Sequence, residues 1–184
     1  MSKITVIIGA MGSGKSALLL SELMKVNCRR DELLILKPKL DTRTPRVIMS
    51  RNGLFAPAIE VENFRDILIQ RCLKDVKYIF IDEVQFIDKE GMLEFYIYCK
   101  EHNVNVFASG LDLTSELSPF DTTAKLMCYA DDIVVVKGDC SCGNESRLSA
   151  FIGGSKDGDV KIGDEEYIGV CEKCHPLIKG VALK

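Results

Sequence analysis

The chain has 184 residues, a net charge of −3 and a hydrophobic content of 47%, which suit a globular protein of one main domain with a small addition. The weakly acidic balance argues against general DNA or RNA binding, which needs a basic surface. No apolar stretch approaches the ~20 residues of a membrane span, and Gly12, Lys15 and Ser16 interrupt any signal-peptide core, so we expect a cytoplasmic protein with neither nucleic acid nor membrane as a partner.

Short β-branched runs alternate with helical patterns over the first part of the chain. Residues 3–8 are predicted to form a buried parallel strand, and residues 16–26 carry leucines at helical spacing. Further core strands are expected at 33–36, 78–81, 104–108 and 133–136, strand-like pieces around Val47 and Ile59, and helices from Asn63 through Cys72, over 89–102 and over 121–130. The alternation predicts an α/β fold, a RecA-like parallel sheet flanked by helices.

The turn after the first predicted strand matches the phosphate-loop pattern G-x-x-x-x-G-K-[ST] in full. Its residues are Gly9, Ala10, Met11, Gly12, Ser13, Gly14, Lys15 and Ser16. Glycines let the backbone direct N–H groups at a phosphate, and the following helix adds the positive end of its dipole. We expect Lys15 to neutralise the β- and γ-phosphates of ATP and the Ser16 hydroxyl to bind Mg²⁺.

Two adjacent acids, Asp82 and Glu83, end the predicted strand 78–81. This strand can lie beside the first one in a parallel sheet, which would bring Asp82 into the Mg²⁺ shell near the phosphates. Adjacent strand residues point to opposite faces, so the chain must turn at Glu83 for both acids to serve one site. Glu83 would then be a general base, toward water in an ATPase or toward a bound hydroxyl in a kinase, and these residues alone leave both open.

Glycines become frequent from residue 137 onward, and four cysteines form two close pairs there. The pairs are Cys140 with Cys142 and Cys171 with Cys174. Two pairs of thiolates are typical of a tetrahedral zinc site, with His175 as an alternative to Cys174; four protein ligands leave no open position, so this zinc would be structural. We expect a P-loop domain over residues 1–136 and a zinc-binding lobe over 137–184, in which the zinc closes residues 143–170 into a lasso loop.

The motifs, taken in order, resemble the thymidine kinases of the small, zinc-containing class. Besides the phosphate loop, the resemblance is carried by a K-P-x-x-D-x-R segment at 37–43, an F-I-D-E-x-Q-F segment at 80–86 and a G-L-D…P-F loop at 110–120. Residues 50–53 are similar to a fourth segment of that class, S-H-x-G, except that Arg51 replaces the histidine. The aromatic residue that many members carry four positions after Leu111 is replaced by Ser115.

The resemblance implies that ATP phosphorylates the 5′-hydroxyl of thymidine, with Glu83 as the base. It also implies a structural zinc, a lasso loop that covers the acceptor, and a homotetrameric assembly. It places four residues beyond the phosphate loop at the ATP: Asp41, Arg43, Asp82 and Gln85. It places nine residues around the nucleoside: Met11, Phe86, Leu111, Ser115, Phe120, Val160, Ile162, Gly163 and Tyr167. Apolar and aromatic walls with a few hydrogen-bonding groups suit a pyrimidine.

Two other functions are compatible with parts of the sequence. A RecA-like ATPase with a structural zinc lobe would use Glu83 to activate water, and a non-catalytic module would use the zinc lobe to bind nucleic acid. The aromatic loop after Gly110 and the lasso favour the kinase over the ATPase. The net charge of −3 argues against the nucleic-acid module.

Overall fold

A parallel sheet forms the centre of the computed structural model, which describes residues 2–69, 73–153 and 166–180. Its strands are β1 (Ile4–Ile8), β2 (Leu33–Pro38), β5 (Ile59–Val61), β6 (Tyr78–Ile81), β7 (Asn105–Gly110) and β8 (Asp132–Val135). Their order across the sheet is β5-β2-β6-β7-β1-β8, and every pair is parallel. The predicted parallel α/β fold is confirmed.

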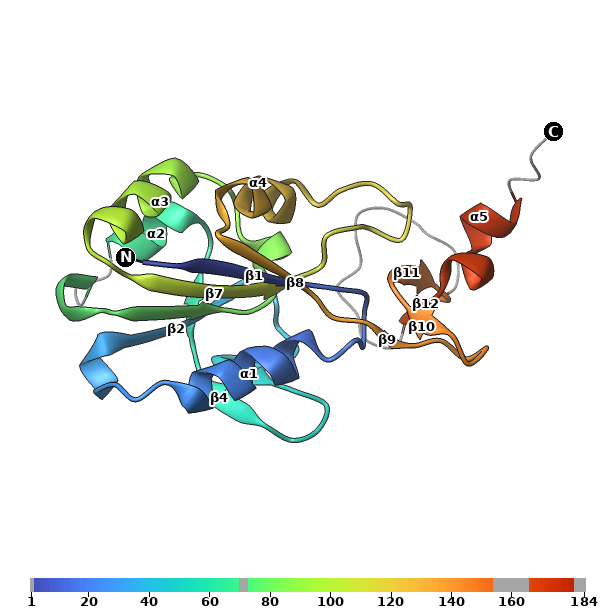
Figure 1. The fold of residues 1–184 in the computed structure, drawn as a ribbon, viewed down its shortest axis with the longest axis horizontal. Coiled ribbons are helices and arrows are strands. Elements are labelled where there is room, and N and C mark those ends of the chain that lie inside the picture. Colours follow the sequence, from blue (N-terminus) through green and yellow to red (C-terminus); the bar gives the residue numbers. More distant parts are fainter. Residues whose placement is uncertain (1, 70–72, 154–165, 181–184) are drawn as a thin grey trace.

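Helices cover both faces of this sheet (Figure 1). They are α1 (Lys15–Lys25), α2 (Phe64–Leu68), α3 (Met92–Glu101) and α4 (Asp121–Tyr129). α1 lies on one face and the other three helices lie on the opposite face. The alternation of strand side chains supplies both cores, because Ile79 and Ile81 of β6 join the core under α2 and α3 whereas Phe80 joins the core under α1.

The hairpin that packs on the α1 face was predicted only in part. It consists of β3 (Val47–Met49) and β4 (Phe55–Pro57), which pair antiparallel. The sequence predicts a piece around Val47 but none at β4, because Phe-Ala-Pro is too short and too ordinary to be distinguished from a loop. Ile48 and Ala56 are buried beside Leu19 and Leu20 of α1, so the hairpin closes this face.

Two other predictions need correction or qualification. β8 was predicted to be a core strand, but it is the edge of the sheet and all four of its residues are exposed. Asn63 does cap α2, since its Oδ1 accepts a hydrogen bond from the Asp66 backbone N–H at 2.8 Å. That helix ends at Leu68 rather than continuing through Cys72, which lies outside the described residues.

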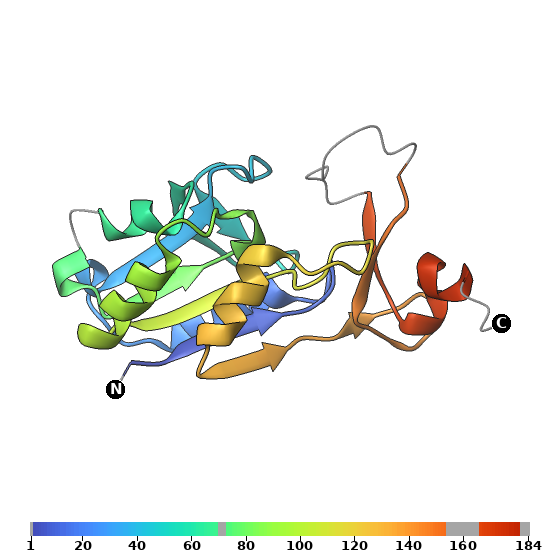
Figure 2. The ribbon, with the colours of Figure 1, turned by 90° about the horizontal axis from the view of Figure 1, so that it is seen from above.

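The C-terminal part forms two small antiparallel sheets, placed at the end of the main sheet where its parallel strands finish (Figure 2). Its elements are β9 (Gly138–Asp139), β10 (Glu145–Ser146), β11 (Leu148–Phe151), β12 (Tyr167–Val170) and the short helix α5 (Pro176–Gly180). Four short 3-10 helices complete the described elements: η1 (Arg30–Glu32), η2 (Leu73–Asp75), η3 (Val84–Phe86) and η4 (Glu172–Cys174).

Among the described residues, no helix has the length and apolar composition that crossing a membrane requires.

Candidate functional site: a phosphate loop facing a carboxylate

The phosphate loop connects the end of β1 to the start of α1. Gly12 has φ +72° and Gly14 has φ +94°, values at which a side chain would be strained. Lys15 is buried, and its Nζ donates a hydrogen bond to the Ala10 carbonyl at 2.8 Å. Burial lowers the pKa of Lys15, although the negative charges of Glu83 and Asp82 raise it in part. The loop backbone therefore surrounds its own lysine, and the negative charges of both acids favour the protonated form of that lysine.

A cavity of about 320 Å³ opens above this loop. Of the sequence-predicted residues, it is lined by Met11, Gly12, Gly14, Lys15, Ser16, Asp41, Arg43, Asp82 and Glu83. Gly9, Ala10 and Ser13 belong to the loop but are buried in its base. The structure thus brings the loop, the acid pair and the Asp41–Arg43 segment around one space.

Glu83 makes the turn that the sequence requires if both acids are to face one site. Its φ of 51° and ψ of 41° are left-handed, which is uncommon for a residue with a side chain. Because of this turn, Asp82 and Glu83 line the same cavity instead of pointing to opposite faces of the sheet. Such strained conformations persist where the surrounding contacts enforce them, and they cluster at functional sites.

Two neighbours hold the Glu83 carboxylate. Arg43 donates from Nη2 to Oε1 at 2.7 Å, and Gln85 donates from Nε2 to Oε2 at 2.5 Å. Arg43 also donates from Nε to Asp41 at 2.7 Å, and Lys37 pairs with Asp41 at 3.3 Å. Burial alone would lower the pKa of Arg43, but its hydrogen bond to Asp41 and the nearby Glu83 charge raise that pKa overall. A network of alternating charges therefore fixes Glu83 in the cavity.

Asp82 is held by a hydroxyl that the sequence reasoning missed. Ser109, which is fully buried in β7, donates a hydrogen bond to the Asp82 carboxylate. Burial and the charge of Glu83 raise the pKa of Asp82 to about 6, although hydrogen bonds from Ser109 and Ser16 oppose this shift. A buried carboxylate beside the Ser16 hydroxyl offers the hard oxygen ligands that Mg²⁺ prefers. The signal in the sequence was a polar residue, Ser109, directly after the predicted strand 104–108 and before Gly110.

The prediction that β6 lies directly beside β1 is wrong, because β7 lies between them in the sheet. Both acids nevertheless face the phosphate loop, since Asp82 and Glu83 follow the end of β6 and reach across the end of β7. Parallel strands of equal direction share one carboxyl edge, so one intervening strand does not remove the site.

Gln85 connects the carboxylate to the loop after β7. Besides donating to Glu83, its side-chain oxygen accepts a hydrogen bond from the Leu111 backbone N–H at 3.0 Å. A Cβ placed on Gly110 would lie 2.6 Å from that oxygen, so a glycine leaves room for this contact. Gln85 does not line the cavity, and its side chain joins Glu83 to the start of the predicted acceptor loop.

The residues predicted to surround the nucleoside lie in several places. Phe86 and Phe120 are half-buried and meet edge to face, with ring centroids 6.2 Å apart. Ser115 is half-buried in the loop that precedes Phe120. Tyr167 packs edge to face on Phe151, with centroids 5.2 Å apart. Three other predicted residues, Val160, Ile162 and Gly163, lie outside the described residues.

The C-terminal part touches the phosphate loop directly. The Met11 backbone N–H donates to the Ser149 hydroxyl at 2.9 Å, and a Cβ on Gly169 would lie 2.8 Å from the Met11 carbonyl. Gly138 makes a similarly close approach to the Cα of Ser13. β11 and β12 are therefore packed against the loop itself.

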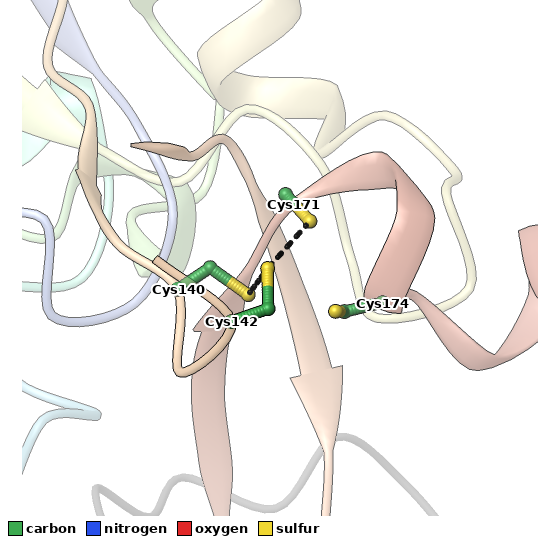
Figure 3. Close-up of side chains that lie close together, drawn as sticks. All are labelled: Cys140, Cys142, Cys171 and Cys174. Carbon is green, nitrogen blue, oxygen red and sulfur yellow. Dashed lines mark hydrogen bonds between the residues drawn. The ribbon is translucent and has the colours of Figure 1, made fainter. Parts of the chain in front are cut away.

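Four cysteines converge in this part (Figure 3). The sulfur atoms of Cys140, Cys142, Cys171 and Cys174 all lie within 4.8 Å of one another. Zn–S bonds of about 2.3 Å place tetrahedral sulfurs roughly 3.8 Å apart, so the donor set fits zinc. Cys174 is therefore the fourth cysteine of this cluster. His175, the alternative ligand, is buried, and its Nε2 lies 3.2 Å from the Ser149 carbonyl oxygen.

The comparisons with known proteins agree with this geometry. A family model described as thymidine kinase matches residues 2–175. A thymidine kinase of Pseudothermotoga lettingae is 34% identical, with 94% of each chain covered. A thymidine kinase of Ureaplasma parvum is 38% identical over 95% of this chain and 82% of its own. A thymidine kinase of enterobacteria phage T4 is 31% identical over 94% of this chain and 95% of its own.

Proposed function

The chain belongs to the thymidine kinase family, and we propose how its residues carry out transfer of the γ-phosphoryl group of ATP to the 5′-hydroxyl of thymidine. The observation that carries the proposal is the left-handed turn at Glu83, which directs a carboxylate into the cavity above the phosphate loop. A carboxylate within reach of a bound triphosphate can act as the general base that takes the proton of the acceptor hydroxyl.

The loop side of the cavity binds and orients the triphosphate. Backbone N–H groups of the loop and the positive end of α1 face the phosphates, and Lys15 neutralises their charge. Ser16 and Asp82 would hold Mg²⁺, which when bound supplies further charge neutralisation on the β- and γ-phosphates. Asp41 contributes by fixing Arg43, whose guanidinium lies beside the same space.

Glu83 is the proposed general base. In the transfer, the 5′-oxygen forms a bond to the γ-phosphorus, the bond from that phosphorus to the β–γ bridging oxygen breaks, and the proton passes to Glu83. ADP leaves with the electron pair of the broken bond. Gln85 positions Glu83 through its hydrogen bond, so we assign it a positioning role beside the ATP site. Catalysis is then mainly orientation and charge stabilisation.

The nucleoside pocket is proposed to form on the other side of Glu83. Gln85 links Glu83 to Leu111, and Phe86, the next residue along the chain, meets Phe120 edge to face. Aromatic edges and faces give a pyrimidine ring a flat apolar wall. Met11, Ser115 and Tyr167, together with the predicted lasso residues Val160, Ile162 and Gly163, complete the proposed set.

The zinc is proposed to be structural. All four ligands come from the protein, so no coordination position remains for a substrate. The thiolates must stay reduced to bind the metal, which together with the need for ATP supports a cytoplasmic location. The contacts of Ser149 and Gly169 with Met11 support a role in placing the acceptor side against the phosphate loop.

The function is tested by measuring ADP formation with and without nucleosides. We expect turnover that depends on thymidine, together with thymidine monophosphate in equal amount to ADP. Equal turnover without any nucleoside would instead support the ATPase, and no turnover in either case would support a binding module. A panel of nucleosides in the same assay tests whether Ser115 changes the choice of acceptor.

We also propose a homotetramer, and the exposed edge of the sheet supports an assembly. Ile133 and Val135 of β8 are each 46% exposed, and unpaired apolar edges are sites of association. We expect Val135→Lys to reduce the mass measured by light scattering, because it places a charge among the exposed apolar side chains of this edge strand. Met24→Lys, a change at an exposed methionine of α1, is the control. A wild-type protein that is monomeric or dimeric would contradict the homotetramer.

A further inference from the structure

Arg51 lies in the turn between β3 and β4, and this hairpin forms one wall of the cavity above the phosphate loop. Residues 47–52 line the cavity from this side. The turn is closed by hydrogen bonds from the Ser50 N–H to the Leu54 carbonyl at 2.9 Å and from the Gly53 N–H to the Ser50 carbonyl at 3.0 Å. Packing of Ile48 and Ala56 on α1 fixes the hairpin, so Arg51 is held opposite the loop.

The guanidinium of Arg51 reaches the loop at Gly12. A Cβ placed on Gly12 would lie 2.8 Å from Nη1 and 3.8 Å from Nη2 of Arg51. The absence of a side chain at Gly12 therefore leaves room for the guanidinium against the loop backbone. Both residues line the cavity, so the charge sits on the wall of the space that the loop surrounds.

The other cations around this cavity are engaged by protein acceptors. Arg43 pairs with Asp41 and Glu83, Lys37 pairs with Asp41, and Lys15 donates to a loop carbonyl. Across residues 2–69, 73–153 and 166–180, the Arg51 guanidinium has no hydrogen bond or ion pair, and its side chain is exposed. A guanidinium presents five N–H donors in a planar fork that matches phosphate oxygens.

We propose that Arg51 is a catalytic residue of this chain that binds the β- and γ-phosphates of ATP. It supplies, from the hairpin of the same chain, the positive charge that an arginine finger supplies in other phosphoryl-transfer enzymes. This inference rests on the proposed function. Arg51 also stands where the similar segment of the class has a histidine, and a guanidinium stays charged at pH values where an imidazole does not.

The chemical step gives Arg51 a defined task. As the bond between the γ-phosphorus and the β–γ bridging oxygen breaks, negative charge grows on that oxygen and on the β-phosphate of ADP. The γ-phosphoryl group bonds to the 5′-oxygen, and the hydroxyl proton passes to Glu83. Arg51 gains and loses no proton; it stabilises the growing charge by donating hydrogen bonds to phosphate oxygens.

The test compares Arg51→Ala, Arg51→Lys and the control Arg46→Ala, which removes an exposed arginine near the same hairpin that does not line the cavity. We expect Arg51→Ala to lower kcat by about 10²-fold, the cost of removing one donor to a developing charge. Arg51→Lys should retain more activity, because it keeps the charge without the fork. Free guanidinium ion should restore part of the kcat of Arg51→Ala.

Binding gives a readout that does not depend on turnover. Arg51→Ala should bind a non-hydrolysable ATP analogue more weakly, with the affinity for AMP and the melting temperature both unchanged. If its kcat and its affinity for the analogue equal those of Arg46→Ala, the assignment of Arg51 is overturned. If the wild-type protein forms ADP equally fast without nucleoside, the kinase proposal fails instead, and the variants still report on Arg51 through ADP formation.

Discussion

Replacing Glu83 with glutamine is expected to lower kcat by about 10²- to 10⁴-fold, the range that a positioned general base contributes. Glutamine has nearly the same shape as glutamate but cannot take the proton of the 5′-hydroxyl. The affinity for ATP should stay close to that of the wild-type protein, since the phosphate loop is unchanged. Steady-state ADP formation gives kcat, and calorimetric titration with a non-hydrolysable ATP analogue gives the affinity.

Two controls separate the base from the ion pair that holds it. Glu62→Gln removes an exposed carboxylate whose partner, Lys39, is also exposed, so it should leave kcat unchanged. Arg43→Gln removes the cation that holds Glu83 and should lower kcat less than Glu83→Gln, because the base itself remains. Unchanged turnover in Glu83→Gln would remove this residue from the role of base.

Removing zinc is expected to have the largest effect on stability. Cys140 and Cys171 are buried in the small core of the C-terminal part, which otherwise rests on Leu148, Ala150 and Val170. Structural zinc sites contribute apparent binding energies of about 10–16 kcal/mol in small peptides, so this core should lose its order without the metal. We expect Cys171→Ser to bind less zinc by elemental analysis and to melt at a lower temperature.

Loss of the zinc should weaken the binding of thymidine and of ATP to different extents. β12 carries Tyr167, a proposed nucleoside residue, whereas the phosphate loop is fixed by β1 and α1, so we expect chelation to weaken thymidine binding more than ATP binding. Cys128→Ser is the matched control for Cys171→Ser, since Cys128 is exposed and lies outside the cluster of four cysteines. A chelated sample with unchanged nucleoside affinity would contradict this role of the zinc part.

The elements next to the active site could be predicted well from the sequence because their signals are local. The phosphate-loop pattern fixes the end of β1 and the start of α1, and the apolar run 78–81 matches β6 residue for residue. The turn at Glu83 could also be inferred, since two adjacent acids can share one site only if the strand ends between them.

The order and the exposure of the strands could not be predicted. β7 separates β1 from β6, yet each of these strands is a similar apolar run that would pair equally well with any other. The Ile-Val-Val of β8 also has the composition of a buried strand, but its exposure depends on which elements cover it and not on its own residues.

The contributions of Ser109 and Arg51 have the same long-range character. Ser109 meets Asp82 across 27 positions of the chain, and Arg51 meets Gly12 only because the hairpin packs on α1. The sequence identified Arg51 as a departure from the similar segment but gave no partner for it. Such contacts follow from tertiary packing, which no single-sequence pattern encodes.

A crystal structure of the zinc-loaded protein with thymidine and a non-hydrolysable ATP analogue tests the central claim most directly. The account predicts that the triphosphate lies in the Gly9–Ser16 loop and that a Glu83 carboxylate oxygen lies about 2.6–3.2 Å from the 5′-oxygen of thymidine. A complex in which Glu83 stays paired with Arg43 while the 5′-oxygen lies beyond hydrogen-bonding reach of it, with another side chain in contact with that hydroxyl, would contradict it.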